Sequence, residues 1–207
     1  MNLEHCLVFF QREEKSPIKV NLPNDYTKII AVDGGLNDVI SLGLKADIFV
    51  GDCDSVNVEL KNLNDIFIYA KEKDFLDGEG ALEYLKSQKF KKLTFYSFFQ
   101  GRWDMSFTHF LSLVHYKDFA NHLEIQTNKS KIFYFTKSFQ LKGKVNQKFS
   151  IIPLENISNL SISGAKYNLE PRDVELGRGL CLSNEFQKSF IDVKWENGEA
   201  LLIEIFN

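Results

Sequence analysis

Short apolar runs alternate with segments of helical periodicity along the first half of the chain. The runs lie at residues 6–10, 28–32, 48–50, 66–70 and 93–99. Between them, apolar residues recur every three or four positions over 36–44, 80–86 and 104–114. Such runs are typical of buried strands, and strands that alternate with helices are joined by crossover connections. The first half is therefore predicted to be a three-layer α/β domain with a mostly parallel sheet.

The second half has a different pattern, rich in short apolar runs that turn residues separate. The runs lie at 131–136, 138–141, 149–152, 160–162, 189–195 and 200–206, and no long helical period interrupts them. This pattern predicts a small β-sandwich or barrel. Asn197-Gly198 stands between the last two runs, and Asn-Gly in such a place predicts a hairpin. We place the two domains at 1–120 and 121–207.

Composition narrows the class of protein. The 207 residues carry 25 Lys and Arg against 28 Asp and Glu, a net charge of −3, which argues against a general nucleic-acid binder. No apolar run approaches the roughly 20 residues that span a bilayer, so we expect no membrane partner. The first residues lack the basic segment of a signal peptide. Three cysteines without CxxC spacing favour neither a disulfide scaffold nor structural zinc, and we expect a cytoplasmic protein.

Two carboxylates directly follow the third apolar run. Gly51 closes that run, and Asp52 and Asp54 come next. Open α/β sheets bind ligands beyond the carboxyl ends of their strands. Mg²⁺ takes one or two carboxylates together with substrate phosphates. The pair therefore indicates metal or phosphate chemistry at this edge of the sheet, and the alternative is a polar loop whose carboxylates cap the next segment.

A glycine pair follows the second apolar run. Asp33 is followed by Gly34 and Gly35 where a helix is expected to begin. Paired glycines let a ligand approach the backbone, and a helix start offers N–H groups to an anion. A tight turn from strand to helix explains the same residues. The chain contains neither a P-loop motif nor a dinucleotide fingerprint.

Charged motifs also stand before two of the expected helices. Residues 73–77 read Lys-Asp-Phe-Leu-Asp, and residues 101–104 read Gly-Arg-Trp-Asp. An arginine can grip phosphate oxygens with two hydrogen bonds, whereas helix capping is the alternative role for both motifs. In the second half, Ser183 and Asn184 offer a hydroxyl and an amide that could orient a small polar heterocycle, unless they form a surface turn.

In this order, the motifs resemble those of the thiamine pyrophosphokinases. The resemblance runs through nearly the whole chain and includes Leu-Ser-Ile-Ser-Gly at 160–164. It implies an N-terminal nucleotide-binding catalytic domain and a C-terminal thiamine-binding β-sandwich, in a homodimer with thiamine bound between the subunits. The implied reaction transfers a pyrophosphoryl group from ATP to the hydroxyl of thiamine, giving thiamine diphosphate and AMP, with Mg²⁺ present.

The resemblance also implies roles for individual residues. The metal ligands would be Asp52, Asp54 and Asp74. The nucleotide would contact Asp33, Gly34, Gly35, Lys73, Asp74 and Arg102. The catalytic groups would be Asp54, Asp77, Arg102 and Asp104, and thiamine would contact Ser183 and Asn184. Asp77 or Asp104 could accept the hydroxyl proton, and the sequence does not choose between them.

Several residues depart from the family's motifs. Leu76 stands in place of a threonine, Met105 in place of a histidine and His109 in place of an asparagine, and Gln100 replaces a glycine. The implied metal-holding carboxylates are kept, while the groups around nucleotide and acceptor differ. Two alternatives to thiamine pyrophosphorylation therefore stand: a pyrophosphokinase of the same fold acting on another hydroxyl acceptor, and a non-catalytic protein that binds nucleotide or thiamine.

Overall fold

The structure is a computed structural model that describes residues 5–13, 18–51, 65–68, 77–88, 90–99, 103–115 and 120–206. The chain forms two compact units, Met1–Asn128 and Lys129–Asn207. The strand at 120–126 pairs in parallel within the sheet of the first unit, so that unit extends beyond residue 120.

The first unit is built on a parallel sheet. Its described strands are β1 (His5–Phe9), β2 (Lys28–Val32), β3 (Ile48–Gly51), β4 (Asp65–Ile68), β5 (Phe90–Tyr96) and β6 (Ala120–Gln126). They lie in the order β6-β5-β1-β2-β3-β4, and every pairing among them is parallel. The strand order reverses between β1 and β5. Strands β2, β3 and β4 follow one another on one side of β1, whereas β5 and β6 lie on its other side.

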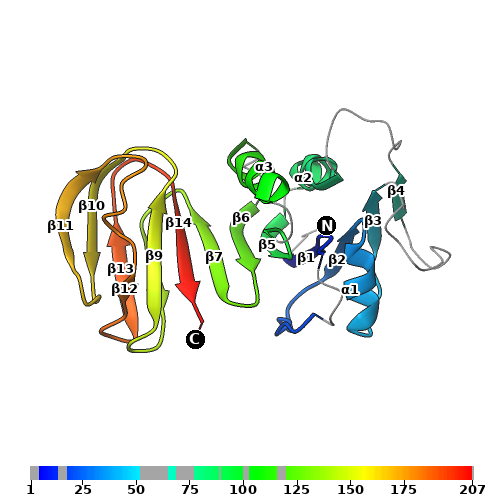
Figure 1. The fold of residues 1–207 in the computed structure, drawn as a ribbon, viewed down its shortest axis with the longest axis horizontal. Coiled ribbons are helices and arrows are strands. Elements are labelled where there is room, and N and C mark those ends of the chain that lie inside the picture. Colours follow the sequence, from blue (N-terminus) through cyan, green and yellow to red (C-terminus); the bar gives the residue numbers. More distant parts are fainter. Residues whose placement is uncertain are drawn as a thin grey trace. The chain divides into compact units, whose positions relative to one another are not determined.

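The described helices, α1 to α3, cover this sheet on two faces (Figure 1). Helix α1 (Gly35–Ser41) packs its Leu36 and Val39 against Leu7 and Phe9 of β1. Helices α2 (Asp77–Gln88) and α3 (Trp103–His115) contact each other and lie on the opposite face. Because both faces are covered, the strands are apolar at nearly every position, as the sequence pattern predicts.

The second unit contains two antiparallel sheets. Its strands are β7 (Ser130–Phe135), β8 (Phe139–Lys142), β9 (Lys148–Pro153), β10 (Ile157–Ser163), β11 (Leu169–Val174), β12 (Asn184–Glu185), β13 (Phe190–Lys194) and β14 (Ala200–Ile205). One sheet runs β12-β9-β14-β7 and the other runs β11-β10-β13-β8. Side chains of both, among them Phe149 and Leu202 from one and Leu160 and Val193 from the other, form one buried core. The predicted α/β domain followed by a β-sandwich is confirmed.

Two local expectations are wrong. The strand expected at 93–99 ends at Tyr96, because Ser97 takes a positive φ of 61° and turns the chain even though two phenylalanines follow. The expected hairpin at Asn197-Gly198 does not form, since β13 pairs in one sheet and β14 in the other. The turn instead moves the chain between sheets, and Trp195 Nε1 donates to the carbonyl of Gly198 at 2.9 Å.

Candidate active site

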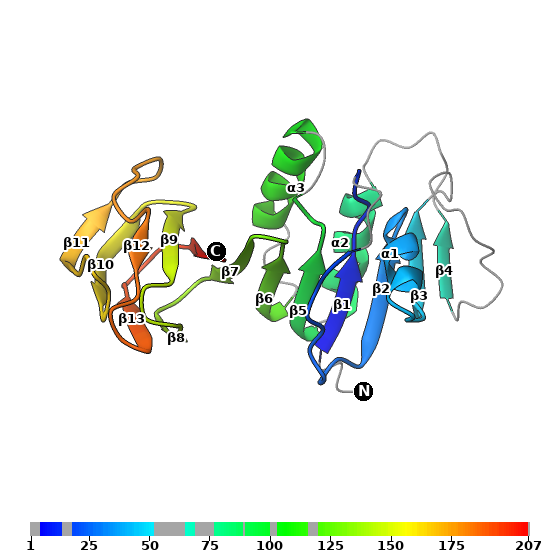
Figure 2. The ribbon, with the colours of Figure 1, turned by 60° about the horizontal axis from the view of Figure 1, so that its bottom comes forward.

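Three of the predicted site residues, together with a glycine that ends a strand, lie at one edge of the parallel sheet. Asp33 follows β2, Gly51 ends β3, Asp77 begins α2, and Asp104 lies in the first turn of α3 after β5. Because the strands of the first unit are parallel, their carboxyl ends all lie at this edge (Figure 2). Open α/β sheets bind ligands there, next to the point at which the strand order reverses.

Asp33 is held in an unusual backbone conformation at this edge. Its φ is +47°, which costs free energy for a residue other than glycine. The amide of Asp33 donates to the carbonyl of Val50 at 2.9 Å, and its carbonyl accepts from the amide of Leu36 at 3.1 Å. Its carboxylate atom Oδ1 is buried. Such strain persists where the surrounding structure enforces it, and it is frequent at functional sites.

The glycines after Asp33 leave room for the segment that follows β1. A Cβ on Gly35 would overlap the carbonyl of Phe9, and one on Gly34 would lie 3.0 Å from Cγ of Gln11. The close approach that these glycines permit is therefore an approach of protein to protein. Their expected contact with nucleotide stays a prediction.

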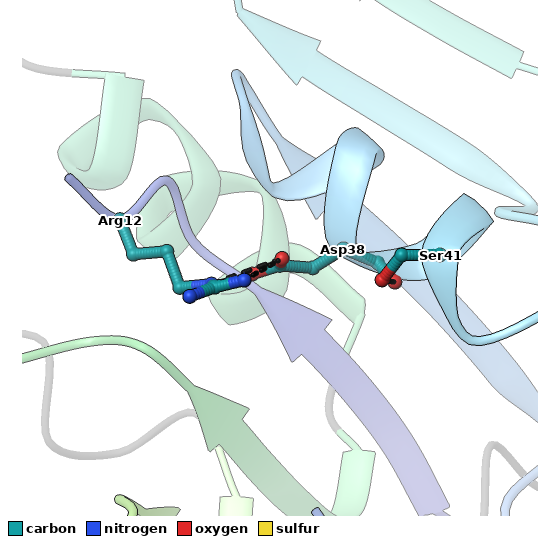
Figure 3. A network of polar contacts seen from close by, with 3 residues as sticks. All are labelled: Arg12, Asp38 and Ser41. Atoms are coloured by element: carbon teal, nitrogen blue, oxygen red, sulfur yellow. Dashed lines mark hydrogen bonds and ion pairs between the residues drawn. The ribbon is translucent and has the colours of Figure 1, made fainter. Parts of the chain in front are cut away.

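An ion pair that we did not anticipate fixes the same segment (Figure 3). Arg12 follows β1, and its Nε lies 2.7 Å from Oδ2 and 2.9 Å from Oδ1 of Asp38, in the first turn of α1. A second guanidinium nitrogen lies 2.8 Å from Oδ1. Both side chains are 8% exposed. Sequence separation of 26 residues hides this pair from pattern analysis, although Arg12 is one of only four arginines.

The start of α3 presents Asp104 to solvent. Its side chain is exposed, and Oδ1 accepts a hydrogen bond from the amide of Met105 at 3.0 Å. Further along α3, Nδ1 of His109 lies 3.0 Å from the carbonyl oxygen of Phe98, and its ring stacks on the Phe98 ring. Burial lowers the pKa of His109, which favours the neutral imidazole.

The remaining predicted residues of this domain lie outside the described residues. These are Asp52, Asp54, Lys73, Asp74 and Arg102, and for Asp77 only the backbone is described. The parts of the chain that the structure describes hold no group of three or more His, Cys, Asp or Glu side chains placed to bind a metal. All three expected metal ligands fall outside those parts.

In the second unit, Asn184 joins two segments. Its side chain is buried; Oδ1 accepts from the amides of Tyr167 and Glu185 at 3.0 and 2.9 Å, and Nδ2 donates to the carbonyl of Tyr167 at 2.8 Å. The neighbouring Ser183 is exposed, has a φ of +56°, and donates its amide to Ser150 Oγ. Asn184 thus binds the backbone of Tyr167 on both sides.

Tyr167 itself is exposed. Its side chain is 62% accessible, and Nζ of Lys166 lies 5.7 Å from the ring centroid. Lys166 also pairs with Glu185 at 3.1 Å, which raises the pKa of its ammonium. Tyr167 is not among the residues that the sequence motifs single out.

Two family models match these two units in order. The catalytic domain of thiamin pyrophosphokinase matches residues 20–126, and the vitamin B1 binding domain of thiamin pyrophosphokinase matches residues 136–198. The chain belongs to the thiamin pyrophosphokinase family. The resemblance inferred from the motifs, and the class of enzyme it implied, are confirmed.

Relatives and solved structures agree with the family. Thiamine pyrophosphokinase from Bacillus subtilis is 26% identical over 192 residues, with 87% of this chain and 88% of that protein covered. Thiamin pyrophosphokinase 1 from Caenorhabditis elegans is 22% identical over 203 residues, covering 90% and 83%. The crystal structure of the Bacillus subtilis protein has a TM-score of 0.83 at 20% identity, with 99% of both chains covered.

Among the described helices, none has the length and apolar character to cross a bilayer.

Proposed function

We propose that this chain transfers a pyrophosphoryl group from ATP to the hydroxyl of thiamine, giving thiamine diphosphate and AMP. The observation that carries the proposal is the match of a catalytic-domain model and a vitamin B1 binding-domain model, in that order, onto the two units. The first unit binds ATP at the carboxyl edge of its sheet. The second unit binds thiamine.

The residues at the carboxyl edge suit a magnesium nucleotide. Asp33 brings a buried carboxylate oxygen against Gly51, directly before Asp52 and Asp54 in the chain. Hard carboxylate oxygens are the protein ligands that Mg²⁺ prefers, so this set of donors fits the ion, with Asp74 as a further ligand. Bound Mg²⁺ would neutralise charge on the triphosphate.

The chain's own residues supply binding and proton transfer in this proposal. Lys73 and Arg102 neutralise phosphate oxygens, and Arg102 can do so through two parallel hydrogen bonds. Asp104, exposed at the start of α3, and Asp77, at the start of α2, are the two candidates to accept the proton of the attacking hydroxyl.

Tyr167 is the residue of the second unit that suits the cationic, aromatic acceptor. An exposed ring can stack on a heterocycle and attract a positive charge to its face. Asn184 fixes the backbone of Tyr167, so its contribution to thiamine binding is to position the residue that carries the ring. Ser183 is exposed, and its hydroxyl takes no part in the hydrogen bonds by which Asn184 holds Tyr167. It can therefore contact a ligand directly.

A homodimer is part of the proposal, and the surface of α3 supports it. Trp103, Phe107 and Leu111 are spaced four residues apart and are exposed by 89%, 63% and 53%. They form one apolar stripe of a kind that association covers. We propose that a second copy of the chain covers it. Sedimentation should give a dimer for the native chain and a monomer for Phe107→Asp, and a native monomer would refute this part.

A cytoplasmic location is also proposed. Cys6 and Cys181 are buried free thiols in the described residues, as expected where disulfides do not form. Burial raises the pKa of both thiols, which keeps them protonated and unreactive.

The test is AMP release from ATP and Mg²⁺ across a panel of hydroxyl acceptors. Thiamine should be the acceptor with the highest kcat/KM, and AMP should form only when an acceptor is present. Faster turnover with another alcohol would favour a different acceptor specificity. The physical reason to expect one is that Met105 stands where the family's motif has a polar histidine. Binding of ATP or thiamine without turnover would instead indicate a non-catalytic role.

A further inference from the structure

His109 reaches two segments that enter the proposed site from different strands. Its Nδ1 lies 3.0 Å from the carbonyl oxygen of Phe98, just after β5. Its ring stacks on that of Phe98 with centroids 5.0 Å apart and an angle of 18° between the planes. The ring also lies 5.9 Å from that of Phe10, after β1. The imidazole is therefore fixed by a hydrogen bond and by aromatic packing.

The other ring edge of His109 faces the start of α2. A Cβ on Gly78 would lie 2.6 Å from Nε2 and 3.1 Å from Cδ2 of His109, so only glycine leaves space for the imidazole. Glycine inside a helix costs about 1 kcal/mol relative to alanine. The poor helix former in the first turn of α2 is thus explained by the histidine on α3.

The start of α2 and the segment after β5 carry the groups that the proposed reaction uses. Gly78 directly follows Asp77, while Phe98 lies shortly before Arg102 and Asp104 in the chain. The carbonyl of Phe98 can only accept, so Nδ1 of His109 carries the hydrogen. The neutral ring then presents an unprotonated Nε2 toward α2.

We propose that His109 is a positioning residue, matched to Gly78, that holds the start of α2 and the segment after β5 in the arrangement the reaction requires. The role in catalysis rests on the proposed function; the placement of the two segments does not. Positioning matters because a displacement of about 1 Å at reacting groups can cost about 100-fold in rate.

The test compares three variants on α3. His109→Leu removes the donor, His109→Asn keeps an amide nitrogen near the place of Nδ1, and His115→Leu is the control on the exposed end of the same helix. We expect His109→Leu to lower kcat for AMP formation by about 10-fold or more with little change in the KM of thiamine. His109→Asn should recover kcat to within about threefold, and His115→Leu should match the native chain.

Two readouts do not depend on turnover. Hydrogen exchange at the amides of 97–99 should accelerate in His109→Leu and return toward the native rate in His109→Asn. Gly78→Ala should lower Tm by about 3 °C in the native background, because the added Cβ overpacks against the imidazole. In the His109→Asn background the same change should leave Tm level or raise it, since alanine is the better helix former.

The outcomes separate the two claims. If the native chain forms no AMP, the proposed function fails while exchange and the Gly78 comparison still decide the placement by His109. If His109→Leu lowers Tm but leaves both kcat and exchange at 97–99 native, His109 is merely structural and the inference is overturned. Equal effects of Gly78→Ala in both backgrounds would overturn the pairing.

Discussion

Gly51 lies directly beneath the carboxylate of Asp33, so that a Cβ at position 51 would overlap Oδ1 of Asp33. Asp33 directly follows β2 and Gly51 ends the neighbouring parallel strand β3, and the amide of Asp33 donates to the carbonyl of Val50, the residue before Gly51. Gly51 also has a φ of +153°, which disfavours any side chain. The position of the Asp33 carboxylate is therefore set by a glycine on the adjacent strand.

Gly51→Ala should displace Asp33. Gly43→Ala is the matched control, because Gly43 also has a positive φ, +71°, yet nothing lies within 4 Å of its added Cβ. Backbone strain alone should cost about 1–2 kcal/mol at Gly43, and overlap should add about 1–3 kcal/mol at Gly51. Urea unfolding measures both free energies. Equal losses in the two variants would show that the contact with Asp33 carries no energy.

The buried pair of Arg12 and Asp38 should contribute far more than an exposed one. Asp38→Asn removes the negative charge from the carboxylate that pairs with a guanidinium only 8% exposed, which should cost about 3–5 kcal/mol of unfolding free energy. Glu175→Gln is the control, since Glu175 and its partner Arg178 are more than 70% exposed, and it should cost less than about 1 kcal/mol. Chemical denaturation measures the unfolding free energy of both variants. Similar small losses of this free energy would contradict a stabilising role for the ion pair of Arg12 with Asp38.

His109 should make stability depend on pH. Burial lowers its pKa in the folded chain below the ordinary value of 6.5, so the unfolded chain binds the proton first as pH falls. The stability is complete above pH 6.5 and declines as pH falls from 6.5 toward the lowered value, by at most about 1.4 kcal/mol per pH unit. Unfolding of the native chain and of His109→Asn between pH 8 and pH 5 should diverge below 6.5; parallel curves would refute the lowered pKa.

Tyr167 and Asn184 should act together on the acceptor. Tyr167→Ala removes an exposed ring, so it should raise the KM of thiamine by about 10-fold, leave that of ATP unchanged and preserve Tm. Asn184→Ala should raise the same KM and also lower stability by about 1–3 kcal/mol, because buried backbone groups lose their partners. Steady-state kinetics with each substrate varied in turn measures both. A change in the KM of ATP alone would place thiamine elsewhere.

Much of the fold follows from local pattern. Buried apolar runs such as 28–32 and helical spacing over 36–44 sufficed for the α/β unit, because a doubly covered sheet needs apolar residues throughout. The β-sandwich could be predicted from short apolar runs that turn residues separate. The hairpin predicted at Asn197-Gly198 was wrong, because a turn that tolerates positive φ suits a change of sheet as well as a hairpin.

The sequence could indicate which elements carry the candidate site residues, but not which contacts those elements make. The sequence put Asp33 directly after a strand and Asp104 at the start of a helix, as the structure does, while their roles in the reaction stay predictions. The partners of these segments could not be foreseen, since Arg12 meets Asp38 across 26 residues and Asn184 meets Tyr167 across 17. Spacing in sequence carries no information about such pairs.

The central claim is tested most directly by measuring AMP and thiamine diphosphate together, from ATP, Mg²⁺ and thiamine. The native chain should form both in equal amounts. Asp33→Asn should lower the rate by about 100-fold or more, because it removes a carboxylate from the oxygen donors that would hold Mg²⁺ at the triphosphate. Asp47→Asn, whose side chain accepts from the amide of Ile29 at the opposite edge of the sheet, should keep the native rate. AMP without thiamine diphosphate, or no AMP from the folded native chain, would contradict the account.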